Sequence, residues 1–183
     1  MKQSSKTALC GMTAALGVVI MLLSTLPLFY VAAPAFPGML TMLIVIEVDR
    51  KWAFGVYAAV ALISFFICPD KEAAMLYLAF FGYYPIIKSV FESKLPRAVE
   101  ILLKFVVFNA AVIAAYYVLS KFMGVDLNEF GEMGSKNLPL KTAIPIVLAL
   151  ANVAFAVLDF CMTSFVTLYI HRFQKYFRKL FKF

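Results

Sequence analysis

The side chains of this chain that could do chemistry are few, and three of them are ionisable groups associated with apolar runs. Asp159 is the one ionisable residue between Ala143 and Ile170, and Lys88 and Lys104 lie toward the ends of two earlier runs. Charged groups are costly in the hydrocarbon region and either pair with one another or mark functional sites. Asp159 could form a structural ion pair with Lys88 or Lys104, or it could contact a ligand. We favour the ion pair, because the three residues lie toward the cytoplasmic half.

Two asparagines and several aromatic residues form a second candidate group. Asn152 lies seven residues before Asp159 and therefore on the same helix face, and Asn109 lies at a similar depth in the preceding run. The two amides could bond to each other across two helices, or they could orient a ligand. Aromatic side chains in the outer half could wall a pocket for a flat, partly apolar molecule, although core packing explains them as well. The predicted ligand-binding set is Tyr77, Phe81, Asn109, Tyr116 and Asn152.

Catalytic and metal-binding patterns are not found in the sequence. The single histidine, His171, follows the last apolar run, and no paired carboxylates or Cys/His pair accompany it. The three cysteines, Cys10, Cys68 and Cys161, have no metal-ligand spacing and no disulfide framework. We therefore expect no enzymatic activity, no cofactor and no metal.

The composition is that of an integral membrane protein. Hydrophobic residues make up 64% of the 183 residues, and the mean hydropathy is +0.92, well above ordinary globular usage. The formal net charge of +7 is explained by basic residues that flank membrane spans on the cytoplasmic side. Nucleic-acid binding is therefore not expected.

The apolar runs predict an all-α fold, a bundle of six transmembrane helices with both termini in the cytoplasm. The expected spans are Thr7–Phe29, Gly38–Ile46, Trp52–Cys68, Ala73–Phe91, Ala98–Phe122 and Ala143–Ile170. The second run is short and could be re-entrant. With one crossing fewer, however, the basic tail would lie outside, which the positive-inside rule disfavours, so we expect the second run to span. Twelve basic residues then lie inside, namely Lys2, Lys6, Arg50, Lys51, Lys88, Lys94, Arg97, Arg172, Lys175, Arg178, Lys179 and Lys182. Four lie outside, namely Lys71, Lys121, Lys136 and Lys141.

The connections and the tail complete a single domain over residues 1–183. Pro27, Pro34 and Pro37 are expected to break the helix and leave an uncharged outer connection. The longest loop, Met123–Lys141, is external and polar, and is either a binding loop or merely flexible. Residues 171–183 are basic and aromatic at helical spacing, and they predict an amphipathic helix on the cytoplasmic lipid surface. We expect a multi-pass protein of the cell membrane, of the bacterial plasma-membrane type.

The first span carries a row of small residues near its cytoplasmic end. Thr7, Gly11 and Ala15 follow one another at intervals of four, and Ala8 lies beside them. Small residues at this spacing allow another helix to approach closely. Such a face could pack inside the bundle or dock a second protein.

In these features the chain resembles the substrate-binding S-component of energy-coupling factor transporters. The resemblance rests on the size, the six expected spans, the opening KTALCGMTAALGVVIML and the proline-bearing aromatic connection before a short second helix. It implies that the small residues of the first helix dock a transmembrane coupling subunit, which two cytosolic ATPases drive. The strict Ala-x-x-x-Ala of that family is absent, because Met12 stands four residues after Ala8. The resemblance also implies a small organic, vitamin-like substrate bound from outside, since no histidine-rich N-terminus of the metal-binding kind is present.

The alternative is a non-transporting membrane scaffold, similar to the rod-shape-determining membrane proteins of the cell-wall machinery. Those proteins share the size and the helix count. In that case the polar groups would be structural, and the short loops would contact protein partners.

Overall fold

The computed structural model describes residues 3–26, 32–123 and 140–175, and every described element is helical. The chain forms α1 (Gln3–Leu22), which a short 3₁₀ turn extends to Thr25, and then α2 (Ala32–Glu47) and α3 (Arg50–Ile67). It continues as α4 (Lys71–Leu76), a π-helical turn (Tyr77–Phe81) and α5 (Tyr84–Lys94). The last elements are α6 (Arg97–Met123) and α8 (Leu140–Leu168), the latter followed by a second π-helical turn (Tyr169–Phe173).

Five of the six helical segments are long and apolar enough to cross a membrane, when α4 to α5 are taken as one segment. These five are Gln3–Thr25, Arg50–Ile67, Lys71–Lys94, Arg97–Ala115 and Pro145–Phe173. The sixth, α2, is a shorter apolar helix of 16 residues. The helical elements confirm the expected all-α fold, and the five candidate spans confirm the expected multi-pass membrane character.

The short helix α2 lies at the centre of the molecule. It packs against α1, α3, α5 and α8, and nine of its 16 residues are buried. Its glycine, Gly38, has no room for a side chain, because a Cβ atom there would lie 2.5 Å from the carbonyl oxygen of Phe81. Similarly, a Cβ atom on Gly17 of α1 would lie 3.1 Å from Val60 of α3. Close packing at these two glycines therefore holds α2 against the π-helical turn and α1 against α3.

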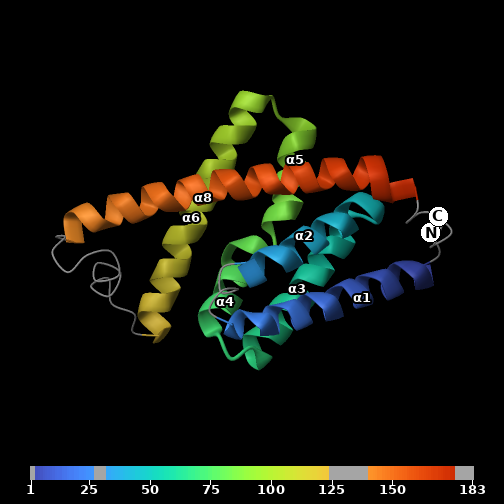
Figure 1. Cartoon of the computed structure of the whole chain (residues 1–183), viewed down its shortest axis with the longest axis horizontal. Coiled ribbons are helices and arrows are strands. Elements are labelled where there is room, and N and C mark those ends of the chain that lie inside the picture. The colour runs from blue at the N-terminus through green and yellow to red at the C-terminus, as the bar shows by residue number, and fades with distance from the viewer. Residues whose placement is uncertain (1–2, 27–31, 124–139, 176–183) are drawn as a thin grey trace.

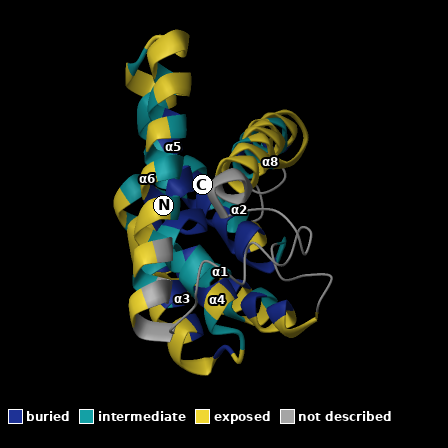
Figure 2. Cartoon of the chain, turned by 90° about the vertical axis from the view of Figure 1, so that its left-hand side faces the viewer, coloured by how far each residue is buried: buried dark blue, intermediate teal, exposed yellow. Residues whose placement is uncertain are grey.

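The second half of the molecule is more open. In Figure 1, α5 and α6 form a hairpin whose turn stands away from the other helices, and α6 crosses α8 instead of running beside it. Figure 2 shows mostly exposed residues at the far end of this hairpin. In its most apolar stretch α8 has 11% of its residues buried, against 44% for Lys71–Lys94. The structure thus consists of a packed group of helices and a hairpin whose turn projects from it; we call this hairpin the arm (residues 84–123).

One local expectation was wrong. Pro34 and Pro37 do not lie in an outer connection, because α2 already begins at Ala32. Pro34 occupies the first turn, where a missing N–H is tolerated, and Pro37 is buried inside the helix. The fourth expected span is confirmed as the segment Lys71–Lys94, which is long and apolar enough to cross a membrane. Within it a π-helical turn (Tyr77–Phe81) precedes Gly82, and Pro85 lies at the start of α5.

Three further predictions fall outside the described residues. They concern the break at Pro27, most of the outer loop (residues 124–139) and the end of the basic tail (residues 176–183).

Candidate functional site

Five ionisable side chains meet where the arm crosses α8, and we call them the charged cluster. They come from three helices and are Lys88 and Glu92 on α5, Glu100 and Lys104 on α6, and Asp159 on α8. The sequence predicted that Asp159 forms an ion pair with Lys88 or with Lys104. The structure places all three together and adds two carboxylates.

Lys88 is fully buried and joins α5 to α8. Its ammonium group contacts the carboxylate of Asp159 and donates to the hydroxyl of Thr163 at 2.8 Å. It also lies 2.9 Å from Glu92, one helical turn further along α5. A buried ammonium group needs such partners, because removing it from water costs several kcal/mol. Asp159 receives a further bond of 2.5 Å from the hydroxyl of Tyr84.

Lys104 is the centre of the cluster, because its ammonium group contacts all three carboxylates. The distances are 3.1 Å to Glu92, 2.5 Å to Glu100 and 3.3 Å to Asp159. The two lysines and three carboxylates together carry a formal charge of −1 (2 − 3) when all are ionised. The carboxylates retain some contact with the surroundings, since their side chains are 35%, 14% and 24% exposed respectively. The ion pairs of the cluster therefore link α5, α6 and α8 to one another.

Sequence reasoning missed Glu92 and Tyr84 as members of this site. The signal for Glu92 was its spacing of four from Lys88, which places opposite charges on one helix face. No comparable signal existed for Tyr84. Its hydroxyl reaches Asp159 only because α5 and α8 are neighbours in space.

The two asparagines lie at the same crossing and bond to each other. Asn109 donates to the side-chain oxygen of Asn152 at 2.9 Å, and Asn152 donates back at 3.2 Å. Each amide also donates to the backbone of its own helix, to Phe105 and to Leu148. All four amide N–H groups therefore have acceptors. A ligand could bond to these amides only by sharing or replacing that pairing.

The structure does not gather the remaining predicted ligand residues around an open pocket. Tyr77 is 0% exposed and its ring contacts Tyr57 of α3, and Phe81 is buried with its backbone against Gly38. The side chain of Tyr116 lies outside the described part of the chain. Instead, the ring of Phe80 in the π-helical turn meets both Phe108 of α6 and Phe155 of α8. Its proximity could not be read from the sequence.

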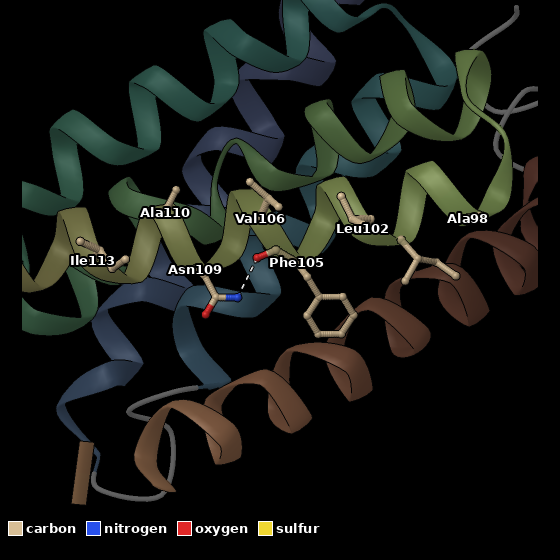
Figure 3. Close-up of a pocket in the computed structure, with 8 residues that line it drawn as sticks. Ala98, Leu102, Phe105, Val106, Asn109, Ala110 and Ile113 are labelled. Atoms are coloured by element: carbon tan, nitrogen blue, oxygen red, sulfur yellow. Dashed lines mark hydrogen bonds between the residues drawn. The ribbon is translucent and has the colours of Figure 1, made fainter. Parts of the chain in front are cut away.

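A shallow, open hollow runs along one side of α6, and among the described residues its lining comes from that helix alone (Figure 3). It is apolar except for the amide of Asn109. Its lining residues repeat at helical spacing and are Ala98, Ile101, Leu102, Phe105, Val106, Asn109, Ala110 and Ile113.

The small residues of α1 face away from the other helices. Thr7, Ala8, Gly11 and Ala15 are all exposed, and a Cβ atom on Gly11 would have no neighbour within 4 Å. Of the two uses that the sequence allowed for this face, internal packing is not the one seen in this structure.

Metal binding finds no support in the described residues, where no three His, Cys, Asp or Glu side chains are arranged to hold an ion. No family model, curated protein or solved structure matches the chain, so its function has to be argued from the geometry of these sites.

Proposed function

We propose that the chain is the substrate-specific membrane subunit of an ATP-driven uptake transporter of the energy-coupling factor type. The observation that carries this proposal is the exposed small-residue face of α1. A face lined by Thr7, Ala8, Gly11 and Ala15 lets the backbone of another helix approach closely. Its occupant in the proposal is the transmembrane coupling subunit, which two cytosolic ATPases drive.

The substrate in this proposal is a small, vitamin-like organic molecule that enters from outside. Its site lies where α6 and α8 diverge beyond their crossing, with the amides of Asn109 and Asn152 at its base. The amides supply the few polar contacts that such a mostly apolar site needs. The charged cluster lies on the other side of this pair along both helices and holds them together. The site needs no side chain from Tyr77 or Phe81, which support it from the core.

The orientation in this proposal has six spans with both termini in the cytoplasm. It follows from the twelve-to-four distribution of Lys and Arg residues and predicts the outcome of cysteine labelling. In a chain whose own cysteines are replaced, Glu132→Cys should react with an impermeant reagent from outside. Lys179→Cys should react only after permeabilisation. Labelling of both from the same side would contradict this topology.

The partner is tested by purifying the chain from native membranes and identifying the proteins and small molecules that remain bound. The wild type should retain a coupling subunit and two ATPases, and Gly11→Leu should lose them while remaining folded. Gly55→Leu is the matched control, because Gly55 of α3 is also open on its Cβ side. Retention of cell-wall proteins in place of ATPases would favour the scaffold alternative. Intact assembly of Gly11→Leu would refute docking through α1.

The substrate site is tested with any small molecule that co-purifies. Asn152→Leu should weaken its binding about tenfold or more, equivalent to about 1.4 kcal/mol. The double variant Asn109→Leu/Asn152→Leu removes both amides and leaves no orphaned partner. If the double variant restores binding, the amides serve only each other and the proposed site is wrong.

A further inference from the structure

The last residue of α2, Glu47, is hydrogen-bonded to the far end of α8. Its side chain is buried, and one carboxylate oxygen, Oε1, accepts two hydrogen bonds. The hydroxyl of Tyr169 donates at 3.3 Å, and the side-chain amide of Gln174 donates at 3.1 Å. Figure 1 shows the two helix ends side by side. Because the helix dipole opposes a carboxylate at the C-terminus of a helix, these donors stabilise Glu47 where it lies.

The π-helical turn at the end of α8 explains how two residues five positions apart reach the same oxygen. In a regular α-helix such residues point about 140° away from each other. Here the backbone N–H of Gln174 bonds to the carbonyl oxygen of Tyr169, so the turn contains one extra residue. The extra residue brings Gln174 round to the side of Tyr169. Turns of this kind are rare, and the two bonds to Glu47 favour this one.

A regular α-helix over the same residues would present different side chains to Glu47. Residues three and four positions after Tyr169 would then share its face, and these are Arg172 and Phe173. Both are exposed here, and Arg172 is in none of the ion pairs formed within the described residues. A guanidinium group is a strong partner for a carboxylate. Glu47 thus has two competing sets of partners, which require different helix registers.

We propose that Glu47 switches the end of α8 between two registers. In the register seen here, the turn is π-helical, Gln174 bonds to Glu47, and Arg172 is exposed. In the other register the segment is a regular α-helix, Arg172 pairs with Glu47, and the residues after the turn are rotated by about 100° around the helix axis.

The switch changes which side chains the end of α8 presents to its surroundings. In the topology proposed above this end lies at the cytoplasmic surface, where exposed basic residues attract anionic lipid. The π-helical register therefore leaves Arg172 available to lipid headgroups, and the α-helical register withdraws it. That consequence rests on the proposed function, whereas the switch itself does not.

The register is measured by distances between pairs of spin labels in the full-length protein, with its own cysteines replaced. Labels at Lys51→Cys and Lys175→Cys report the chain after the turn, because both positions are exposed. Labels at Lys51→Cys and Leu168→Cys report the chain before the turn, where Leu168 is 55% exposed. Glu47→Leu, which accepts no hydrogen bond, should shift the first distance and leave the second unchanged.

The matched control is Glu47→Gln, whose side-chain oxygen can still accept both bonds and which should keep both distances of the wild type. Thermal unfolding in detergent checks that each variant is folded. If Glu47→Leu does not fold, Gln174→Leu takes its place, because it keeps the carboxylate and releases it to Arg172. Gln174→Leu should likewise shift the first distance alone.

The alternative partner is tested by Arg172→Gln in two backgrounds. It should lower the melting temperature of Gln174→Leu, in which Arg172 pairs with Glu47, and leave that of the wild type unchanged. Equal effects in both backgrounds would remove Arg172 from the switch. An unchanged first distance in a folded Glu47→Leu, or in Gln174→Leu, would overturn the switch. A shift of both distances would also overturn it, since the end of α8 would then have detached from α2. None of these readouts needs a substrate or a coupling subunit, so they can fail independently of the proposed transport function.

Discussion

The helices of the first half of this chain and those of the second half are joined by different kinds of contact. Close packing holds the first helices, as at Gly38 of α2 against the backbone carbonyl of Phe81 in the π-helical turn. Helices α5, α6 and α8 meet through aromatic rings around Phe155 and through polar side chains. The polar contacts are the charged cluster and the asparagine pair, which together we call the polar crossing. In lipid there is no hydrophobic drive between helices, so close packing or polar bonds must supply the attraction. The polar crossing is confined to the second half, whereas the tightest glycine contacts are in the first.

The difference shows which half can change shape. Closely fitting backbones have a single good arrangement, since interiors are densely packed and deform little. The start of α5 is buried against α2, whereas the turn of the arm is exposed. The turn of the arm and the sparsely buried α8 are therefore the parts best placed to move relative to the packed helices.

The largest expected effect comes from removing the centre of the polar crossing. Lys104→Met leaves three carboxylates with one lysine, so it should destabilise the fold by about 3–5 kcal/mol, as breaking a buried ion pair does. Thermal unfolding in detergent measures this, with Lys51→Met as an exposed control. Asp159→Leu should cost less, because Glu92 and Glu100 still give each lysine a carboxylate. A larger loss of stability for Asp159→Leu than for Lys104→Met would mean that the ion pairs to α8 contribute more to stability than the charge balance of the cluster does.

The next effect belongs to the packed helices. Gly38→Ala places a methyl group 2.5 Å from a backbone oxygen of Phe81, which cannot rotate away as a side chain can. We expect a loss of about 1–3 kcal/mol, typical of overpacking, again measured by thermal unfolding. Gly55→Ala is the control, because its Cβ direction is empty. Equal melting temperatures for the two variants would show that α2 and the π-helical turn are not held by close approach.

A smaller effect is expected at the asparagine pair. Asn152→Leu leaves one N–H and the oxygen of Asn109 without the partners that they have now. Polar bonds between membrane helices average about 0.6 kcal/mol and reach about 1.7 kcal/mol, and the loss of stability should fall in that range. A double-mutant cycle with Asn109→Leu measures the coupling. Zero coupling would show that the two amides do not depend on each other.

The smallest effect on stability is expected on the outer face of α1. Gly11→Leu adds a side chain where no atom lies within 4 Å, so the free energy of unfolding of the isolated chain, followed by thermal unfolding, should stay within about 0.5 kcal/mol of the wild type. The same variant should lose its membrane partner, as proposed above. Strong destabilisation of the isolated chain would place this face inside the fold and remove the basis for docking.

The sequence alone determined the class of the protein and much of its helix pattern. The spans expected over Ala98–Phe122 and Ala143–Ile170 correspond to α6 and to α8 with its terminal π-helical turn, because long apolar runs have few alternatives in a membrane. The sequence also identified Lys88, Lys104 and Asp159, since ionisable groups in apolar runs must find partners. Where helices end was harder to predict. Pro34 and Pro37 looked like breaks, yet the buried position of α2 accommodates both.

Only the tertiary structure decided which side chains meet. Periodicity placed Tyr77 and Phe81 on a helix but could not show that both face the core. It left two roles open for Asn109 and Asn152, and their mutual bonding became visible only when α6 crossed α8. The exposure of Gly11 was equally undetermined, because a small residue favours close approach without specifying which helix approaches. The physical reason is the same in each case. Local spacing fixes the face of a helix on which a side chain lies, while the neighbour of that face depends on how all the helices pack.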